Sequence, residues 1–544
     1  MEHALSTAQR ETDCLPGFWC FGCLPHLTPR DEMVVRGITM LTRLKVNGFK
    51  NLVNIDVRFG PFTCIAGPNA VGKSNLFDAI RFLSALSNQT LMDAALSVRS
   101  ETVSDGDVRN IFHRVGDTMA EKMSFEVEMI APAEAVDDLG QVGRPTANHL
   151  RYTLELRYRE GASTWGHSHG PLEVVKEELV HIHVKDAPRS LLFDHSPGQW
   201  RNSALRIHRR GMPFISTRGK ADSRVIHVHQ DSGGGGRTVK DPASQPRTVL
   251  CVANASESPT ALCARREMES WRMLQLEPSA LREPDSVNAP PHLAANGLHL
   301  PATLYRLAKA HGAEGEEAGI VHPGVADRLA HLVTDVVGVE VDLNEVRELL
   351  TVVATGKDGT RHPARSLSDG TLRFLALVVM QMDPLNRGLI CLEEPENSIH
   401  PGRIAAVVEL LQDIPTDPAR RISDQNSLSQ VIVNTHSPAV VLQVPDDSLL
   451  IAESLADRSS KGSFRKAVFG HLPNTWRDKI DPPGRIVPKD RLLSYLNPGT
   501  PDEKALEGFY AQIGRRYLSG DDLPKRSRVA DRDDLQPLLI RLGD

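Results

Sequence analysis

The stretch "FTCIAGPNAVGKSNLFDAIRFLSAL", residues 62–86, combines three local patterns that decide the fold. Its short apolar run, residues 62–66, is typical of a buried strand. The run leads directly into the glycine-rich sequence Gly67–Ser74, and from Phe77 onward apolar residues recur at helical spacing. Strand, glycine-rich loop and helix in this order form the context in which the pattern G-x-x-x-x-G-K-[ST] binds phosphate.

The residue types in this loop suit the phosphate chain of a nucleotide. Glycines allow backbone N–H groups to turn inward around the β-phosphate, Lys73 can reach the β- and γ-phosphates, and the Ser74 hydroxyl can ligate Mg²⁺. We therefore predict ATP and Mg²⁺ as ligands. The nucleotide-binding residues predicted here are Gly67, Pro68, Asn69, Ala70, Val71, Gly72, Lys73, Ser74 and Asn75.

A second apolar run, Leu389–Leu392, predicts a buried strand that ends in Glu393 and Glu394. Open α/β sheets place their ligands at the carboxyl ends of strands. We assign Glu393, with Ser74, to magnesium and Glu394 to polarising the attacking water, because hydrolysis requires positioning and charge neutralisation. A third strand ends in "NTHSP", where His436 is expected to contact the γ-phosphate.

The sequence "LSDGT", Leu367–Thr371, precedes a third helical stretch and has two possible roles. Ser368 can cap that helix by accepting a hydrogen bond from an N–H group of the first turn. A Ser-x-Gly turn at a helix start also suits a phosphate. The residues alone leave open whether the turn only caps its helix or also reaches a nucleotide held by another subunit.

Bulk properties exclude several classes of protein. The 544 residues carry a net charge of −6, so any contact with nucleic acid requires a local basic patch. The seven cysteines are odd in number and some lie in expected core strands, which favours a reducing, cytoplasmic compartment. No segment approaches the ~20 consecutive apolar residues that span a bilayer, so no membrane partner is expected.

The chain divides into five predicted segments, which are an irregular tail, two halves of one α/β domain, a lobe inserted between the halves, and an extension: 1–39, 40–135, 301–455, 136–300 and 456–544. Strands are expected in "LVHIHV" and "RVIHVHQ" and near residues 349–355, and helical spacing is expected over 320–350. Two groups could bind metal, although surface histidines and an irregular tail are more ordinary explanations: His181/His183 with His227/His229, and Cys14, Cys20 and Cys23 with His26.

In this order the glycine loop, "LSDGT", "LEEPENSIHP" and "NTHSP" resemble the ABC-type ATPase head shared by SMC proteins, RecF-like repair ATPases and OLD-like AAA ATPases. The resemblance covers residues 41–135 and 300–455 and is closest to bacterial AAA ATPases whose acidic motif reads Glu-Glu-Pro-Glu. It implies an α/β P-loop NTPase fold of ABC-ATPase-like head type, with a mixed sheet flanked by helices and a large inserted lobe.

The resemblance also implies roles for further residues. Lys50 and Asn51 are expected near the nucleotide, and Ser398–His400 correspond to the D-loop at a dimer interface. Ser368, Asp369 and Gly370 are expected to reach a nucleotide bound by the partner of an ATP-driven homodimer or higher oligomer.

Some residues depart from the pattern of these relatives. Ala70 replaces a common glycine, and Glu393 stands where many P-loop enzymes use aspartate. The glutamine of the Q-loop has no clear counterpart, and His113 is the candidate in that region. Glu453 is the one acidic residue at the position where OLD proteins add nuclease ligands, so we expect no intrinsic nuclease.

The functional expectation is a hydrolytic ATPase that acts as sensor or scaffold in bacterial anti-phage defence and controls a separate effector, a nuclease or toxin. The Septu-type ATPase is one relative of this kind. One alternative is a RecF-like repair ATPase that acts on DNA, for which Arg209 and Arg210 are candidate phosphate contacts. Another is an ATP-binding scaffold that barely hydrolyses ATP.

Overall fold

The structure is a computed structural model, and it describes residues 39–98, 107–159, 170–206, 212–219, 223–231, 235–240, 242–310, 325, 328, 336–383, 388–423, 426–480, 484–496 and 529. The candidate zinc ligands Cys14, Cys20, Cys23 and His26, and the candidate DNA contacts Arg209 and Arg210, lie outside these residues. Among the described residues, none of the helices has the length and apolar character needed to cross a membrane.

The first layer is an antiparallel sheet with the strand order β13-β12-β11-β10-β9-β6-β1-β2. Long strands such as β9 alternate buried and partly exposed residues, as expected where one face packs on a core. The strands are β1 Met40–Asn47, β2 Ile55–Arg58, β6 Lys122–Ile130, β9 His149–Tyr158, β10 Leu172–His181, β11 Ile215–Arg218, β12 Val225–His229 and β13 Gly236–Lys240.

The second layer is a mixed sheet with the order β14-β19-β20-β3-β21-β22-β23. Strands β14 to β21 along this order run parallel, and β22 returns antiparallel to β21. Its central strands are continuous apolar runs because both faces are covered. The strands are β3 Phe62–Ala66, β14 Arg272–Leu274, β19 Gly388–Glu393, β20 Ser429–Thr435, β21 Leu449–Ser459, β22 Gly462–His471 and β23 Arg485–Ile486.

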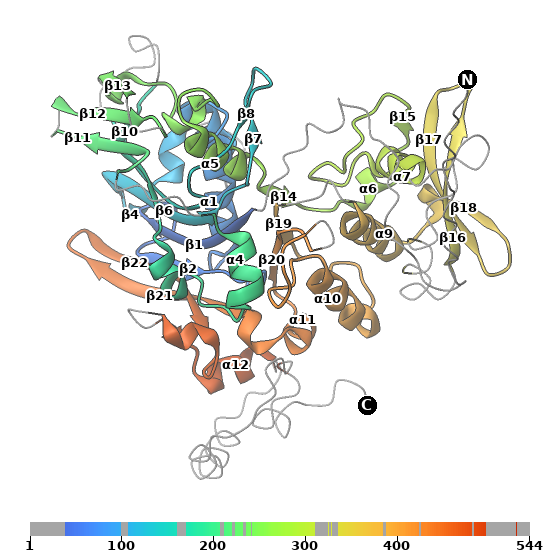
Figure 1. Cartoon of the computed structure of the whole chain (residues 1–544). Helices are drawn as coiled ribbons and strands as arrows, with labels where there is room; N and C mark the ends of the chain where they lie inside the picture. The colour runs from blue at the N-terminus through green and yellow to red at the C-terminus, as the bar shows by residue number, and fades with distance from the viewer. Residues whose placement is uncertain are drawn as a thin grey trace, which may run out of the picture.

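Helices cover both faces of the mixed sheet, as Figure 1 shows. One core joins α1 and α5 to the antiparallel sheet, and a second joins α7, α9, α10, α11 and α12 to the other face and to a small sheet. The helices are α1 Lys73–Leu86, α2 Leu91–Leu96, α5 Pro259–Glu269, α6 Pro278–Leu281, α7 Leu300–Ala310, α9 Asp369–Met382, α10 Ile404–Asp413, α11 Pro438–Gln443 and α12 Lys489–Leu496; the small sheet contains β15 Asp285–Ser286, β16 Val336–Asn344, β17 Leu349–Gly356 and β18 Arg361–Pro363.

A buried glutamine connects the two large sheets. The Gln430 side chain on β20 accepts a hydrogen bond from the Leu41 N–H at 2.9 Å and donates to the carbonyls of Leu41 and Gly60, each at 2.8 Å. The pairing register of β1 with β6 shifts between Leu41 and Arg43, so the backbone at this irregularity needs a partner from outside the sheet. Gln430 provides that partner and is fully buried.

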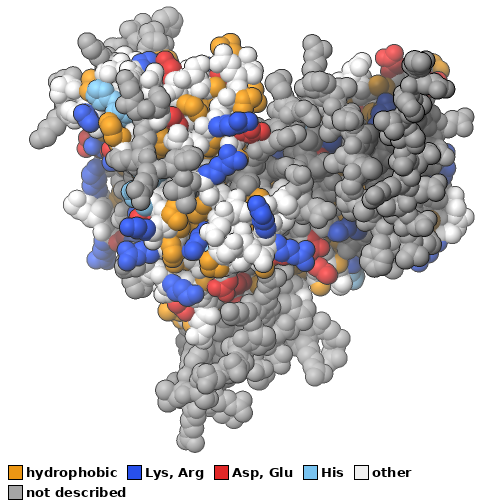
Figure 2. All heavy atoms as spheres, in the orientation of Figure 1, with side chains coloured by type: hydrophobic (Ala, Val, Ile, Leu, Met, Phe, Trp, Pro, Cys, Tyr) orange, Lys and Arg blue, Asp and Glu red, His pale blue; other side chains and the backbone are white. Residues whose placement is uncertain are grey.

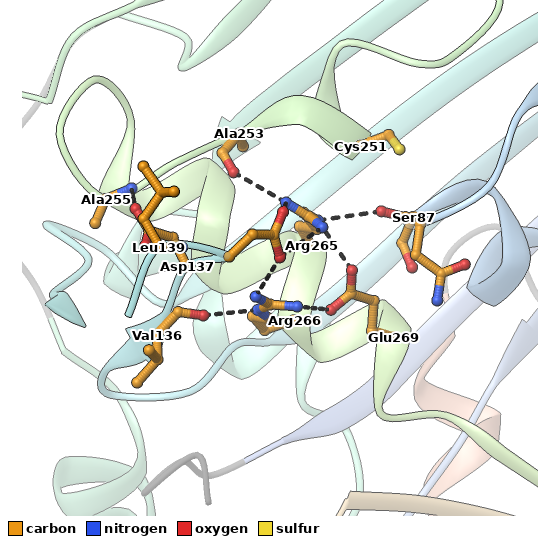
Figure 3. Close-up of polar contacts among 12 residues, drawn as sticks. Ser87, Val136, Asp137, Leu139, Cys251, Ala253, Ala255, Arg265, Arg266 and Glu269 are labelled. Carbon is orange, nitrogen blue, oxygen red and sulfur yellow. Dashed lines mark hydrogen bonds and ion pairs between the residues drawn. The ribbon is translucent and has the colours of Figure 1, made fainter. Parts of the chain in front are cut away.

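Helix α5 carries a polar network that fixes the hairpin of β7 Ala135–Val136 and β8 Val142–Gly143 (Figure 3). Arg265 donates to the Ser87 carbonyl, just after α1, and pairs with Asp138 of the hairpin turn. Arg266 donates to the Val136 carbonyl at 2.8 Å. Because the side chain of Arg265 is buried, this network connects the far end of α1 to the hairpin through groups that are shielded from water.

The mixed sheet flanked by helices confirms the predicted fold class. The segment predicted as an inserted lobe, 136–300, differs from the expectation, because β9 to β13 continue the sheet that β1, β2 and β6 begin. The boundary at 455 likewise falls within β21, whose hairpin with β22 completes the mixed sheet. Alternating residues are a local signal, and the sequence does not show which sheet a strand joins.

The predicted strands in "LVHIHV", "RVIHVHQ" and 349–355 are confirmed as β10, β12 and β17. The predicted helical spacing over 320–350 is wrong from residue 336 onward, where β16 forms an antiparallel pair with β17. Valines at alternate positions, from Val337 to Val341, favour this pairing over a helix.

We predict that Gln430→Leu lowers the free energy of unfolding by roughly 2–4 kcal/mol, because three backbone groups lose their partner in a buried position. Chemical denaturation of the full chain measures this difference. Gln412→Leu, at a partly exposed position on α10, is the matched control and should change stability by less than about 0.5 kcal/mol. Equal stability of the two variants would contradict the role assigned to Gln430.

Candidate functional site

The loop Gly67–Ser74 connects β3 to α1 at the carboxyl end of the mixed sheet. Helix α1 begins at Lys73, so its first N–H groups face the loop. The Lys73 ammonium donates to the carbonyls of Gly67 and Pro68 at 2.6 and 2.7 Å. Burial lowers the pKa of Lys73, although Glu394 and Glu396 oppose this effect. The loop therefore holds a buried cation folded back over its own backbone.

Two glycines allow the loop to pack closely against its surroundings. Gly72 has φ 115°, and a Cβ atom there would lie 2.7 Å from the amide nitrogen of Asn51 and 2.8 Å from the Ala467 Cβ. A Cβ atom at Gly67 would lie 2.4 Å from the Ala452 carbonyl oxygen on β21. Since real Cβ atoms essentially never come so close, both positions require glycine for space as well as for conformation.

Lys50 and Asn51, placed near the nucleotide by resemblance, lie beside the loop. The Asn51 side chain donates to the Val71 carbonyl at 3.2 Å and accepts from the Asn75 amide at 2.8 Å. Lys50 pairs with Asp78 of α1 at 2.7 Å. The turn after β1 is thereby attached to the start of α1 by polar contacts on both sides of the loop.

Glu394 and His436 are in direct contact, although they come from neighbouring strands β19 and β20. His436 Nδ1 lies 2.8 Å from one Glu394 carboxyl oxygen, and the Asn397 amide donates to the other at 2.8 Å. Burial alone would raise the pKa of Glu394, but these hydrogen bonds and the charge of Lys73 lower it. An ionised carboxylate only accepts, so Nδ1 of His436 carries the proton.

Glu396, which the sequence analysis did not single out, is a buried carboxyl beside this pair. It accepts a hydrogen bond from the Thr435 hydroxyl, which in turn accepts from the Ser437 N–H at 2.9 Å. Thr435 and Ser437 flank His436. Burial raises the pKa of Glu396. Glu396 thus fixes the backbone on both sides of the histidine that contacts Glu394.

These groups line one cavity of about 710 Å³. Glu393, Glu394 and Asn434 stand at one side, and Phe464 of β22 stands at another, 4.8 Å between ring centroids from His113. Phe464 belongs to the segment predicted as an extension, so no motif pointed to it. The other predicted residues that line the cavity are Lys50, Asn51, Asn69, Ala70, Gly72, Lys73, Ser74, Asn75 and His113.

A second cavity, of about 570 Å³, contains the "LSDGT" turn. Ser368 caps α9 by accepting from the Thr371 N–H at 3.1 Å, as predicted from its position. Gly370 packs against the Ser398 carbonyl, 3.1 Å from the position of its missing Cβ. Ser368, Gly370, Ser398 and His400 line this cavity, which shares no lining residue with the first. Asp369 instead pairs with Arg282 at 2.5 Å.

Strained backbone concentrates at these two cavities. Among the described residues other than glycine, left-handed φ angles occur at Lys50, Ala70 and Glu394 in the first cavity and at Ser398 in the second. Such conformations cost about 1–3 kcal/mol each and persist where the surroundings impose them. The φ of 62° at Ala70 also explains in physical terms why glycine suits that position.

Other candidate residues lie apart from both cavities. Glu453 pairs with Arg485 at 2.8 Å. His227 and His229 contact Thr238 and Ser216 respectively. His181 and His183 have ring centroids 4.4 Å apart, but over the described ranges no group of three or more His, Cys, Asp or Glu side chains could hold a metal ion.

A model of the family described as "AAA domain, putative AbiEii toxin, Type IV TA system" matches residues 62–131 and 303–442. No curated protein sequence matches this chain. Among solved structures, the SMC head bound to the C-winged helix domain of ScpA is similar at 13% identity and a TM-score of 0.40, over 79% of this chain and 98% of that one.

Two further solved structures are similar. The SMC head domain from Thermotoga maritima has 12% identity and a TM-score of 0.33, over 79% of this chain and 99% of its own. The Smc head domain with an extended coiled coil, bound to the C-terminal domain of ScpA from Pyrococcus furiosus, has 11% identity and a TM-score of 0.39, over 80% and 97%.

We predict that Gly72→Ala lowers the melting temperature more than Gly140→Ala does. Both glycines have positive φ, so both substitutions pay about 1–2 kcal/mol of backbone strain. Only at Gly72 does the added methyl also collide with Asn51 and Ala467, whereas Gly140 has no atom within 4 Å. Thermal unfolding measures both variants, and equal shifts would argue against the close packing of the loop.

Proposed function

We propose that this chain, which carries an AAA-family ATPase domain of the ABC/SMC head type, binds and hydrolyses ATP at composite sites formed by two copies. The observation that carries the proposal is the division of the motifs between two cavities. Lys73, Ser74, Glu393 and Glu394 line the first, whereas Ser368 and Gly370 line the second. A complete site would require the second cavity of one copy to face the first cavity of another.

The first cavity contains the groups needed to hold a triphosphate. Inward N–H groups at the start of α1 and the Lys73 ammonium provide positive charge for the β- and γ-phosphates. On binding, Lys73 would exchange the carbonyls of Gly67 and Pro68 for phosphate oxygens, which removes the mismatch between a buried cation and neutral partners. Phe464 offers an aromatic face at the rim for the base.

Ser74 and Glu393 fit a Mg²⁺ ion, since a hydroxyl and a carboxylate are oxygen donors of the hard type that this ion prefers. When bound, Mg²⁺ neutralises charge on the β- and γ-phosphates. Glu393 ends β19 next to the loop, so its carboxylate is directed to the same cavity as the Ser74 hydroxyl.

Glu394 is the proposed general base. Each of its carboxyl oxygens accepts one hydrogen bond and retains a second lone pair that can accept from water. Its lowered pKa keeps it ionised at neutral pH. His436 holds the carboxylate through Nδ1 and has Nε2 left to contact a γ-phosphate, so the presence of that phosphate can be communicated to the base.

We place this ATPase in bacterial anti-phage defence, as the sensor or scaffold that controls a separate nuclease or toxin. The support is the resemblance to Septu-type ATPases together with the matched family, whose description names a putative toxin and a toxin–antitoxin system. Neighbouring genes distinguish this role from RecF-like repair: a nuclease or toxin gene favours defence, and recombination genes favour repair.

The repair alternative would need a surface for DNA. In the view of Figure 2, lysine and arginine side chains are interspersed with apolar and acidic ones over the part of the surface that is described. This distribution supports a protein-directed role over a DNA-coated one. The alternative of a scaffold with little hydrolysis predicts equally slow turnover for the wild type and Glu394→Gln.

We predict that Ser368→Arg abolishes ATPase activity while monomers still bind ATP, because the substitution blocks only the second cavity. Mixing Ser368→Arg with Lys73→Ala chains should then restore activity, since one site of each mixed dimer combines an intact loop with an intact turn. Equal mixing restores about a quarter of the wild-type sites. Turnover and ATP binding measure these outcomes, and a mixture as inactive as its components would exclude action in trans.

We predict that Glu396→Ala lowers kcat about tenfold and leaves KM within about twofold, because His436 loses its support while the phosphate loop is unchanged. Glu396→Gln keeps an acceptor for Thr435 and should retain near wild-type turnover. Glu409→Ala, an exposed carboxyl on α10, is the matched control. If Glu396→Gln were as slow as Glu396→Ala, the carboxyl would be needed for more than positioning.

A further inference from the structure

A third cavity, of about 350 Å³, lies on the outer face of the antiparallel sheet, and neither the ATP site nor the "LSDGT" turn contributes to it. Its floor is formed by side chains of β1, β2, β6 and β9. The short helices η3 Val184–Asp186 and α3 Ala187–Ser190 form its wall. Nothing in the proposed ATPase mechanism uses this cavity.

The floor is a single row of charged residues directly opposite one another across four strands. The register pairs Arg58 with Arg43, Arg43 with Glu128, and Glu128 with Arg151. Like charges placed directly opposite in a sheet are destabilising, so the Arg58–Arg43 pair is unfavourable in this arrangement. One glutamate stands among three guanidinium groups.

The carboxylates satisfy the arginines unequally. Arg43 binds Asp56 through two hydrogen bonds, at 2.7 and 2.5 Å, and also reaches Glu128 at 3.1 Å. Arg151 donates to the same Glu128 oxygen at 2.8 Å. Both strong interactions of Glu128 therefore use one oxygen and are directed away from Arg58.

Arg58 is the arginine left with weak partners. Its side chain is 7% exposed, yet its contacts are the Ser190 carbonyl at 3.1 Å and the other Glu128 oxygen at 3.6 Å. Its Nε has no hydrogen-bond partner, although that atom is buried. Burial and the neighbouring Arg43 lower the pKa of Arg58. A buried guanidinium with an unpaired N–H costs several kcal/mol unless another group satisfies it.

The remaining lining groups favour an anion as that missing partner. Arg189, His181 and His183 line the wall, with Asp186 as the opposing charge. Around the whole cavity four arginines face two carboxylates, before either histidine is protonated. A purely structural ion-pair network would balance its charges, and this one retains an excess of positive charge that faces a cavity.

We propose that this cavity is a second, non-catalytic binding site for a phosphate monoester, held by Arg58 from the floor and Arg189 from the wall. The planar fork of an arginine matches the oxygens of a phosphate, and a dianion matches the excess positive charge. Two sources share this chemistry: free phosphate in solution, and the 5′-phosphate end of a polynucleotide. The site does not depend on ATP hydrolysis.

The test uses the full chain with Lys73→Ala, so that binding of phosphate at the glycine loop is suppressed. Calorimetry compares inorganic phosphate, a short single-stranded oligonucleotide with a 5′-phosphate, and the same oligonucleotide with a 5′-hydroxyl. We expect at least tenfold tighter binding of the 5′-phosphate form than of the 5′-hydroxyl form, and loss of that difference in Arg58→Gln. Arg347→Ala, at an exposed turn far along the chain, serves as the control.

Arg189→Ala provides a second variant at the wall, in case Arg58→Gln fails to fold, and it should weaken binding of the phosphorylated probe severalfold. Arginine-dependent binding of inorganic phosphate would identify free phosphate as the ligand, and binding confined to the oligonucleotide would identify a polynucleotide end. Equal affinity for the two oligonucleotides, or affinity unchanged in both arginine variants, would overturn the proposal. The ATPase proposal would be unaffected by that result.

Discussion

The steric requirement for glycine at positions 67 and 72 is the constraint on which the rest of the site depends. A side chain at Gly67 would strike the carbonyl of Ala452 on β21, and one at Gly72 would strike Asn51 and Ala467. The loop is therefore enclosed by the turn after β1 on one side and by the β21–β22 hairpin on the other. Segments distant in the sequence must assemble around the loop before its N–H groups have a fixed direction, so folding of the two sheets and formation of the phosphate site are one event.

The same enclosure explains why charges near the loop are arranged in two levels. Glu394 stands in the cavity with hydrogen bonds that keep it ionised, whereas Glu396, two residues later, is buried and has a raised pKa. Two carboxyls that close would repel each other if both were ionised. Burial of the second lets it support Thr435 without adding a full negative charge next to Lys73. A Glu-Pro-Glu sequence can thus supply one reactive carboxylate and one structural carboxyl, and environment decides which is which.

Local patterns predicted the parts of the structure in which one segment determines its own conformation. The loop between β3 and α1, the Ser368 cap and the strand before Glu393 each follow from a few adjacent residues. The sequence did not reveal Phe464 or Glu396, because their roles arise from contacts with residues distant in the chain. It also misplaced the limits of the central lobe, since β9 to β13 join an existing sheet edge and sheet membership is a long-range property.

The arginine row on the outer face shows how a feature can be absent from every local pattern and still be specific. Arg43, Arg58, Glu128 and Arg151 are ordinary polar residues on alternating strands, and each alone predicts a solvent-facing position. Strand register places them in one line, and helix α3 then removes them from water. Desolvation converts an unremarkable set of surface charges into groups that need defined partners. Because Arg58 lacks such a partner among the described residues, its charge constrains what this face of the sheet can bind.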